Sequence, residues 1–123
     1  MAVSVESDVR SALPAGIGIL LSEQGTTSTL VLRGECDLAA QRAVRDAVSD
    51  ALQRGPERLV LDLSLVSFID STGIQVVVEA AKRASRQDTR MVILPGPRSV
   101  QRVFEICHLV EALPFIPKAE VRV

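Results

Sequence analysis

Residues 70 to 73 place one carboxylate, two hydroxyls and one glycine in a row between two apolar stretches. Asp70, Ser71 and Thr72 are residue types that accept hydrogen bonds from the free N–H groups of a helix start, and Gly73 allows a tight turn. A helix cap alone would explain this composition. One cap uses only one oxygen, however, so we expect at least one hydroxyl to face solvent. The helix start would also tolerate a phosphate there, because its N–H groups and its dipole favour negative charge.

The other residues that could do chemistry form no catalytic pattern. The sequence contains no nucleophile elbow around Ser71, no phosphate-binding P-loop and no dinucleotide-binding glycine motif. The single histidine, His108, is expected at the C-terminus of a helix, where it interacts favourably with the helix dipole. Asp62 falls inside a predicted strand with no third metal ligand near it in sequence, and we interpret it as a hydrogen-bonding residue. We therefore expect no enzymatic activity, no cofactor and no metal site.

Composition excludes two kinds of partner. Aromatic residues make up 2% of the chain, with no Trp or Tyr, so the stacking faces that hold single-stranded nucleic acid are missing. The 14 basic and 15 acidic residues give a net charge of -1, which provides no positive field for a phosphate backbone.

No apolar run approaches the roughly 18 residues of a membrane span, and residues 1–10 do not form a secretory signal. We expect a cytoplasmic domain that neither binds nucleic acid directly nor inserts into a membrane.

The two cysteines, Cys36 and Cys107, are too few and too far apart for a disulfide framework or a zinc site. We interpret Cys36 as a small buried apolar residue, which is the usual environment of a free cysteine.

Apolar patterning predicts the elements that position the 70–73 segment. Five runs rich in Val, Leu and Ile are expected to form strands, at residues 17–22, 28–34, 58–66, 91–94 and 113–117. The first two form a hairpin around a Gly-Thr-Thr turn. Apolar residues at helical spacing predict helices after Asp37, after Asp70 and after a capping Ser99.

The resulting order is strand–strand–helix–strand–helix–strand–helix–strand. Alternation of strands and helices implies right-handed crossovers, and we expect an α/β fold with a mixed, mostly parallel sheet of four to five strands packed with helices. A length of 123 residues suits one domain. We place this domain at residues 14–123, after a flexible extension at residues 1–13.

One residue of the helix after Asp70 does not fit a single apolar face. The residues expected to face the core are Ile74, Val77, Val78 and Ala81. At 100° per residue they lie within about 60° of Ile74, whereas Val76 falls at about 200°. We therefore expect Val76 on the outer face of the helix, one turn from Ser71, as part of a docking patch. The alternative is a singly exposed valine, which needs no functional explanation.

Three segments together resemble the STAS family, which includes the anti-sigma factor antagonists and the cytoplasmic domains of sulphate transporters. LVLDLSLVSFIDSTGIQVVVEAAKRA at 59–84 resembles the family's strand–DS[ST]G–helix signature. LVLRGECDLAA at 30–40 resembles its G-E-[LI]-D segment, with Cys36 in the usual Leu/Ile position. RSVQRVFEICHLVEALPFIP at 98–117 is similar to its third helix and last strand. The resemblance covers residues 15 to 117, and the DSTG context is its most specific part.

The resemblance implies a compact α/β domain that acts as a phosphorylation-controlled binding module. Ser71 would be phosphorylated by an anti-sigma factor that is itself a serine kinase, and a separate serine phosphatase would reset it. The unphosphorylated form would sequester the anti-sigma factor and free a sigma factor for transcription. Asp70 would orient the hydroxyl of Ser71, and Asp37 would lie in a second loop beside it. The residues expected to contact the partner are Asp37, Asp70, Thr72, Gly73 and Val76.

Two features depart from the family pattern. Cys36 replaces an aliphatic residue, and the sequence stops at residues 118–123, where family members often carry a further helix. The alternative function is that of a regulatory STAS subunit of a membrane transport system, built on the same fold.

Overall fold

A β-hairpin begins the described part of the chain and forms one edge of a mixed sheet. The computed structural model describes residues 16–116. Its four strands are β1 (Ile17–Gln24), β2 (Thr27–Cys36), β3 (Arg58–Ile69) and β4 (Arg90–Leu94). They lie in the order β1-β2-β3-β4, with β1 antiparallel to β2 and the other two pairs parallel. The predicted hairpin and the mixed, mostly parallel α/β fold are confirmed.

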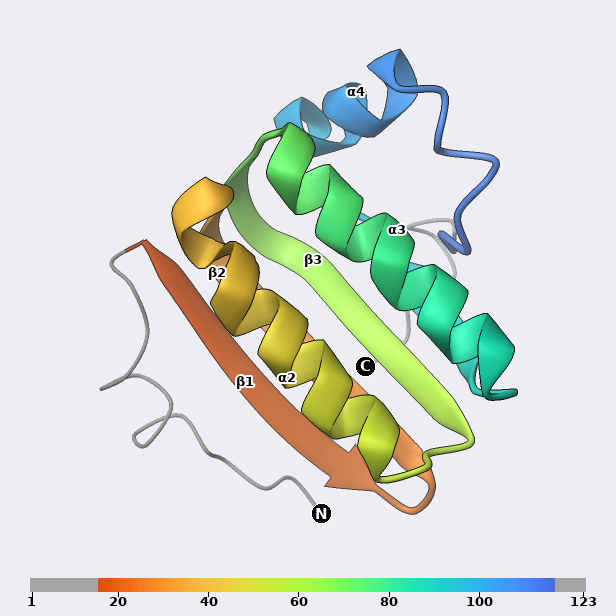
Figure 1. Ribbon diagram of the computed structural model, residues 1–123. Helices are drawn as coiled ribbons and strands as arrows, with labels where there is room; N and C mark the ends of the chain where they lie inside the picture. The colour runs from red at the N-terminus through yellow and green to blue at the C-terminus, as the bar shows by residue number, and fades with distance from the viewer. Residues whose placement is uncertain (1–15, 117–123) are drawn as a thin grey trace.

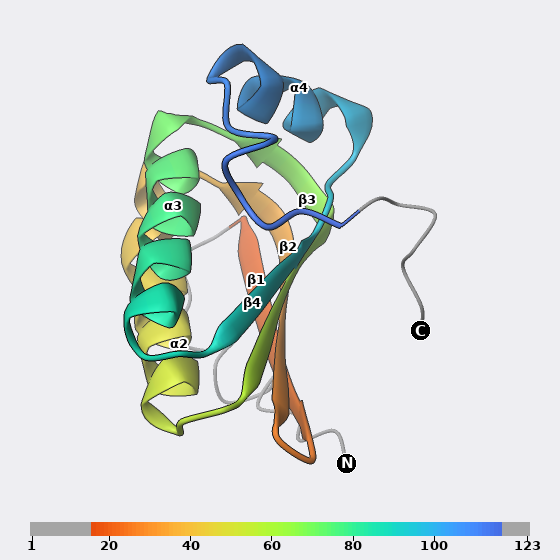
Figure 2. The same ribbon diagram turned by 90° about the vertical axis from the view of Figure 1, so that its right-hand side faces the viewer.

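Helices cover one face of the sheet and one of its ends. They are the short 3-10 helix η1 (Leu38–Ala40), α2 (Gln41–Gln53), α3 (Ser71–Arg86) and α4 (Arg98–Ile106). Figure 1 shows α2 and α3 side by side across the strands, and Figure 2 shows that both lie on the same face of the sheet. α4 packs at the end of the molecule where α3 begins. The described helices include none that is long and apolar enough to cross a membrane.

The core lies between the sheet and the pair α2 and α3. Residues of β1 and β2 alternate between buried and half-exposed positions, as a strand with one covered face requires. The helices contribute Val44, Val48, Ile74 and Val77, which are all buried. Phe104 of α4 is fully buried and completes this core.

Strand β3 contains two irregularities that extend it to the 70–73 segment. Val31 of β2 pairs with Asp62 but Arg33 pairs with Leu65, so β3 carries one extra residue there, and a second shift follows Gly34. The Asp62 carboxylate accepts a hydrogen bond from the N–H of Ser64 at 2.8 Å, within the first bulge. The hydrogen-bonding role of Asp62 is confirmed, but the expectation that it is buried or at a strand end is wrong, since it lies half-exposed within β3. Three residues spaced by three, Leu63, Val66 and Ile69, are buried as a result.

The structure differs from two predictions near the C-terminus. Within residues 16–116, the segment predicted as a fifth strand contributes only one bridge, between Ile93 and Phe115, because the chain runs against β4 too briefly to form a ladder.

The predicted cap of the third helix is wrong, because Ser99 does not precede this helix. α4 begins at Arg98, and the residue before it is Pro97, which has no side-chain oxygen. Gln101 instead accepts a hydrogen bond from the N–H of Gly96 at 3.0 Å. The predicted extension at residues 1–13 lies outside the described residues.

Candidate functional site

Two aspartates follow the carboxyl ends of two neighbouring parallel strands. Cys36 is the last residue of β2 and pairs with Ile69, the last residue of β3. The next residues, Asp37 and Asp70, therefore lie at the same edge of the sheet. Loops at the carboxyl ends of parallel strands are the usual position of binding sites in α/β proteins.

Asp70 is the N-cap of α3. Its carboxylate Oδ1 accepts a hydrogen bond from the N–H of Gly73 at 3.0 Å, and its own N–H donates to the carbonyl of Cys36 at 3.3 Å. The cap interpretation of the 70–73 segment is thus confirmed. The same carboxylate oxygen also accepts a hydrogen bond from the hydroxyl of Thr72 at 2.7 Å.

This arrangement gives the two adjacent hydroxyls different environments. The hydroxyl of Thr72 is held by Asp70, and the residue is half-buried. Ser71 is the first residue of α3 and is exposed, and no hydrogen bond from another residue within 16–116 holds its hydroxyl. Ser71 therefore offers a solvent-facing hydroxyl at the N-terminus of a 16-residue helix.

Asp37 caps the neighbouring helix η1. Its Oδ1 accepts a hydrogen bond from the N–H of Ala40 at 3.2 Å. The backbone N–H of the next residue, Leu38, helps to lower the pKa of the Asp70 carboxyl, and the Asp70 N–H donates to the carbonyl of Cys36, which precedes Asp37. The end of β2 and the loop after β3 are therefore joined through Asp70, and the two aspartates lie on one small surface, as the family resemblance implies.

Hydrogen bonds determine the charge state of Asp70. Partial burial by itself raises the pKa of the Asp70 carboxyl, but hydrogen bonds from the Thr72 hydroxyl and from the backbone N–H groups of Gly73, Leu38 and Thr72 outweigh it. The pKa of Asp70 consequently lies below its usual range, and the group is a carboxylate at neutral pH.

Cys36 lies beneath these two caps. Burial, followed by the negative charges of Asp70 and Asp37, raises the pKa of the Cys36 thiol to about 11. The thiol is protonated at neutral pH, and a protonated buried thiol is a poor nucleophile. The interpretation of Cys36 as a small buried apolar residue is confirmed, since 1% of it is exposed.

Gly73 is a packing residue, and its contact with a partner stays a prediction. It is buried, because the first turn of α3 lies directly against the end of β2. A Cβ at this position would collide with the carbonyl oxygen of Cys36 and would come within 2.7 Å of Ile69 Cγ1. Only glycine fits this close approach.

The prediction that Val76 is exposed on the outer face of its helix is wrong. Val76 is 2% exposed and lies between α3 and α2, where it lines a groove together with Val48. The reason is that α3 packs against two neighbours, the sheet and α2, so its buried arc is wider than one apolar face. The sequence pattern identifies the sheet-facing part of this arc and does not reveal the part facing α2.

Two exposed apolar side chains beside the caps were not predicted. Leu38 is 67% exposed and follows Asp37, and Phe68 is 50% exposed and lies two residues before Asp70. Phe68 faces solvent because the second bulge of β3 changes which residues point inward. The exposure of Leu38 could have been suspected from its position directly after the capping residue Asp37. No sequence signal identified the exposure of Phe68.

Within residues 16–116, no cluster of three potential metal ligands exists.

Comparisons with known proteins agree with this geometry. The family model described as "Mlab, STAS domain" matches residues 7–114. The anti-sigma-F factor antagonist RsfB of Mycobacterium tuberculosis is 27% identical over 83 residues, which are 68% of this chain and 68% of RsfB. An anti-sigma factor antagonist from Mycobacterium paratuberculosis has a similar crystal structure, with a TM-score of 0.76 and 23% identity over 85% of this chain and 88% of that one.

The antagonist SpoIIAA also has a similar fold. Its unphosphorylated form gives a TM-score of 0.69 with 23% identity, over 84% of this chain and 91% of SpoIIAA. The phosphorylated form of SpoIIAA, from Bacillus, gives a TM-score of 0.63 with 22% identity, over 84% of this chain and 95% of that one.

Proposed function

Because this chain belongs to the STAS domain family, we propose that it is an anti-sigma factor antagonist controlled by phosphorylation of Ser71. Its partner is an anti-sigma factor with serine kinase activity. The unphosphorylated protein binds this partner in the cytoplasm and thereby frees a sigma factor. A serine phosphatase returns the phosphorylated protein to the binding form. The relatives named above, which are regulatory binding proteins, support this role.

The observation that carries the proposal is the different state of the two hydroxyls. Ser71 is exposed at a helix N-terminus, whereas the hydroxyl of Thr72 donates to Asp70. Of the two adjacent hydroxyls, that of Ser71 is the one that faces solvent and is available to a kinase. After transfer, the N–H groups and dipole of α3 stabilise the phosphate, so the domain stays folded.

The surface around Ser71 suits a partner that recognises a neutral serine. The exposed side chains of Leu38 and Phe68 supply apolar contact area beside the two capping aspartates. Phosphorylation adds a charge of about -1.5 to -2, next to Asp70 and Asp37. An unmatched charge buried in an interface costs on the order of several kcal/mol, and every 1.4 kcal/mol is tenfold in affinity. Binding is therefore lost on phosphorylation without a change of fold.

The test begins with a pull-down on the unmodified protein and mass spectrometry of the captured partner. The purified partner is then incubated with the protein and ATP. We expect phosphate on Ser71 alone, and none on Thr72 in the Ser71→Ala variant. Phosphorylation of Thr72 in that variant at the wild-type rate would contradict the assignment.

Calorimetry of four forms then measures the switch, with circular dichroism as the control for folding. Unmodified protein and Ser71→Ala are expected to bind the partner, whereas phosphorylated protein and Ser71→Asp are not. Equal affinities of the phosphorylated and unmodified forms would refute the proposal. Capture of a transport ATPase in place of an anti-sigma factor would support the alternative function of a transport subunit.

A further inference from the structure

The face of the sheet that is turned away from α2 and α3, called the open face below, carries apolar side chains. Figure 2 shows these two helices on the opposite face and α4 at one end, so no described helix covers the open face. All residues of its two central rows are half-buried except one valine, which is buried. Strand register places in one row Leu20, Val31, Asp62 and Leu94, and in the next Ser22, Thr29, Val60 and Val92. The two rows therefore form an apolar surface that is only partly shielded from water.

Basic side chains lie at both ends of the open face. Arg33 is exposed at the end toward Ser71, where its partner on β3 is Leu65, which is 54% exposed. At the other end Arg58 and Arg90 are both exposed and lie directly opposite each other on β3 and β4. Like charges opposite each other in neighbouring strands are destabilising, so an acidic side chain beside them would be favourable.

The strand pairing favours a cover over the open face, and its size favours a cover from the same chain. Parallel sheets are normally buried on both faces, and the pairs β2–β3 and β3–β4 are parallel. The two rows cross four strands about 4.8 Å apart and lie about 7 Å from each other, so with their side chains they cover on the order of 300 Å². A stable interface between two proteins buries roughly 800 Å² on each partner. A segment of the same chain needs less area, because its tether holds it at a high effective concentration.

Residues 4–13, which precede β1, have the sequence pattern of a helix with one apolar stripe. Ser4 before the stripe and Pro14 after it are typical start and stop signals of a helix. The match of the STAS family model begins at residue 7, so it includes most of this segment. At 100° per residue, the residues that lie within about 100° of each other are Val5, Val9, Ala12 and Leu13.

The length and the charges of this segment match the open face. A helix over residues 5–13 would be about 14 Å long, which is the distance across four strands. Only three residues separate it from β1, the edge strand. Glu6 and Asp8 flank the apolar stripe on its two sides. When the helix crosses the strands, one carboxylate therefore points toward each basic end of the open face.

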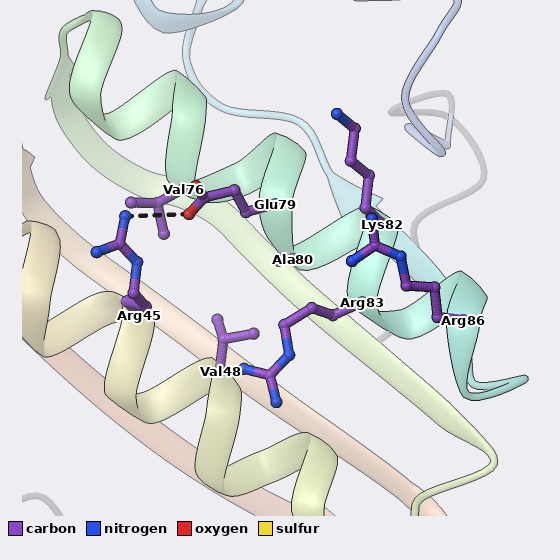
Figure 3. A pocket seen from close by; sticks show the side chains of 8 residues that line it. All are labelled: Arg45, Val48, Val76, Glu79, Ala80, Lys82, Arg83 and Arg86. Atoms are coloured by element: carbon purple, nitrogen blue, oxygen red, sulfur yellow. Dashed lines mark hydrogen bonds and ion pairs between the residues drawn. The ribbon is translucent and has the colours of Figure 1, made fainter.

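The groove between α2 and α3 is a poorer site for such a stripe (Figure 3). Its apolar residues Val48, Val76 and Ala80 are at most 3% exposed and belong to the core. Figure 3 shows charged side chains around them, including Arg45 and Arg83. The groove thus offers a charged, solvated surface and no apolar area to cover.

We propose that residues 4–13 form an amphipathic helix that covers the open face of the sheet in the same molecule. Its apolar stripe packs on the two central rows, and Glu6 and Asp8 pair with the basic side chains at the two ends. This contact takes the place of the flexible extension predicted for residues 1–13. It does not depend on phosphorylation of Ser71.

A nitroxide spin label at residue 7 tests this contact in the full chain. The label is attached to Ser7→Cys on a Cys107→Ser background, since Cys36 is buried and its thiol is protonated at neutral pH. Residue 7 faces away from the stripe, so the label leaves the packing intact. We expect the amide signals of Val31 and Val60 to lose much more intensity than those of α2 and α3.

Two double variants decide whether the apolar stripe holds the segment on the sheet. Val5→Asp, Val9→Asp places charge within the stripe and should restore the signals of the open face. The matched control, Ser4→Asp, Ser11→Asp, places the same charge outside the stripe and should leave the signal loss unchanged. Equal effects of the two double variants would overturn the proposal.

Other occupants of the open face give different results. Spin-labelled chain mixed with isotope-labelled chain that carries no spin label should cause no signal loss. Loss in this mixture would show that a second copy covers the face, and loss confined to α2 and α3 would place the segment in their groove. Absence of any loss would show that the face stays uncovered. Each of these three results overturns the proposal, and none of them affects the proposal for Ser71.

Discussion

The two aspartate caps at the end of the sheet differ in how much structure depends on them. Asp37 accepts one backbone N–H, from Ala40, and starts the 3-10 turn η1, which continues directly into α2. Asp70 accepts hydrogen bonds from the Thr72 hydroxyl and the Gly73 N–H, donates its own N–H to the Cys36 carbonyl at the end of β2, and starts a helix of 16 residues. The same residue type, after the same kind of strand, is thus a local cap in one loop and a connection between two loops in the other. The difference arises because Asp70 also holds a side-chain hydroxyl, that of Thr72, and binds the Cys36 carbonyl through its own N–H.

The largest effect is expected from the position that lets α3 approach β2. Gly73→Ala introduces a Cβ against the Cys36 carbonyl oxygen, a rigid backbone atom. Overpacking of this kind costs roughly 3 kcal/mol of unfolding free energy, which outweighs the gain of about 1 kcal/mol in helix propensity. Urea denaturation measures it. The control is Gly18→Ala, whose Cβ would lie at an ordinary 3.7 Å from Arg33 Cβ and should change stability by less than about 1 kcal/mol. Similar effects at the two positions would show that the approach of α3 is not constrained.

Alanine at the two caps tests the comparison directly. We expect Asp70→Ala to lower the free energy of unfolding by about 2 kcal/mol and Asp37→Ala by about 1 kcal/mol. Both values lie within the usual range for removal of a helix cap. The reason is that Asp70→Ala leaves both the Thr72 hydroxyl and the Gly73 N–H without their acceptor, whereas Asp37→Ala leaves only the Ala40 N–H. Urea denaturation of both variants gives the values. Equal losses would mean that the additional hydrogen bond from the Thr72 hydroxyl to Asp70 contributes nothing.

Acid titration of stability sharpens the same comparison. The pKa of Asp70 is lower in the folded protein than its ordinary value near 4, so its carboxylate stabilises the fold above that pH. This contribution is lost as the pH falls through the folded pKa, below about pH 4. Asp70→Asn should therefore be less stable than the unmodified chain at neutral pH, with a difference that shrinks on acidification. Denaturation curves at several pH values provide the measurement. A difference independent of pH would show that hydrogen bonding to the ionised form is not responsible.

The smallest effect is expected at the thiol that lies beneath both caps. Burial is the main cause that raises the pKa of Cys36, and the charge of Asp70 ranks before that of Asp37. On a Cys107→Ser background, Asp70→Asn should lower the pKa of Cys36 from about 11 by more than Asp37→Asn does. The ultraviolet absorbance of the thiolate during alkaline titration reports this pKa. A larger decrease in the Asp37 variant would reverse the order of the two carboxylates around the sulfur.

Local patterns in the sequence were sufficient where neighbours along the chain determine the structure. The hairpin, the buried strands and the cap at Asp70 all depend on residues close to each other in the sequence. The juxtaposition of Asp37 with Asp70 followed from the family resemblance, and the parallel pairing of β2 with β3 provides its physical basis.

Packing partners distant in sequence explain what could not be predicted. Val76 is buried by α2, which lies about thirty residues earlier in the chain, and no periodicity within α3 identifies that neighbour. Gly73 looks like a turn residue until the carbonyl of Cys36 is placed against it. The exposure of Phe68 depends on bulges that alter the alternation of β3, and bulges leave no clear trace in an apolar run. Leu38 is exposed next to a cap, where apolar patterning carries no information on burial.

The short length of β4 has a consequence for motion at the candidate site. β4 pairs with β3 only from Arg58 to Asp62, so beyond Asp62 the described part of β3 has a strand neighbour on one side alone, β2. Amide hydrogen exchange through local opening is faster where fewer contacts must break. The half of β3 that leads to Ser71 is therefore expected to exchange its amide protons sooner than the half between β2 and β4. The surface that carries Ser71 follows a segment of β3 that we expect to open locally while the hydrogen bonds between β2, β3 and β4 remain formed.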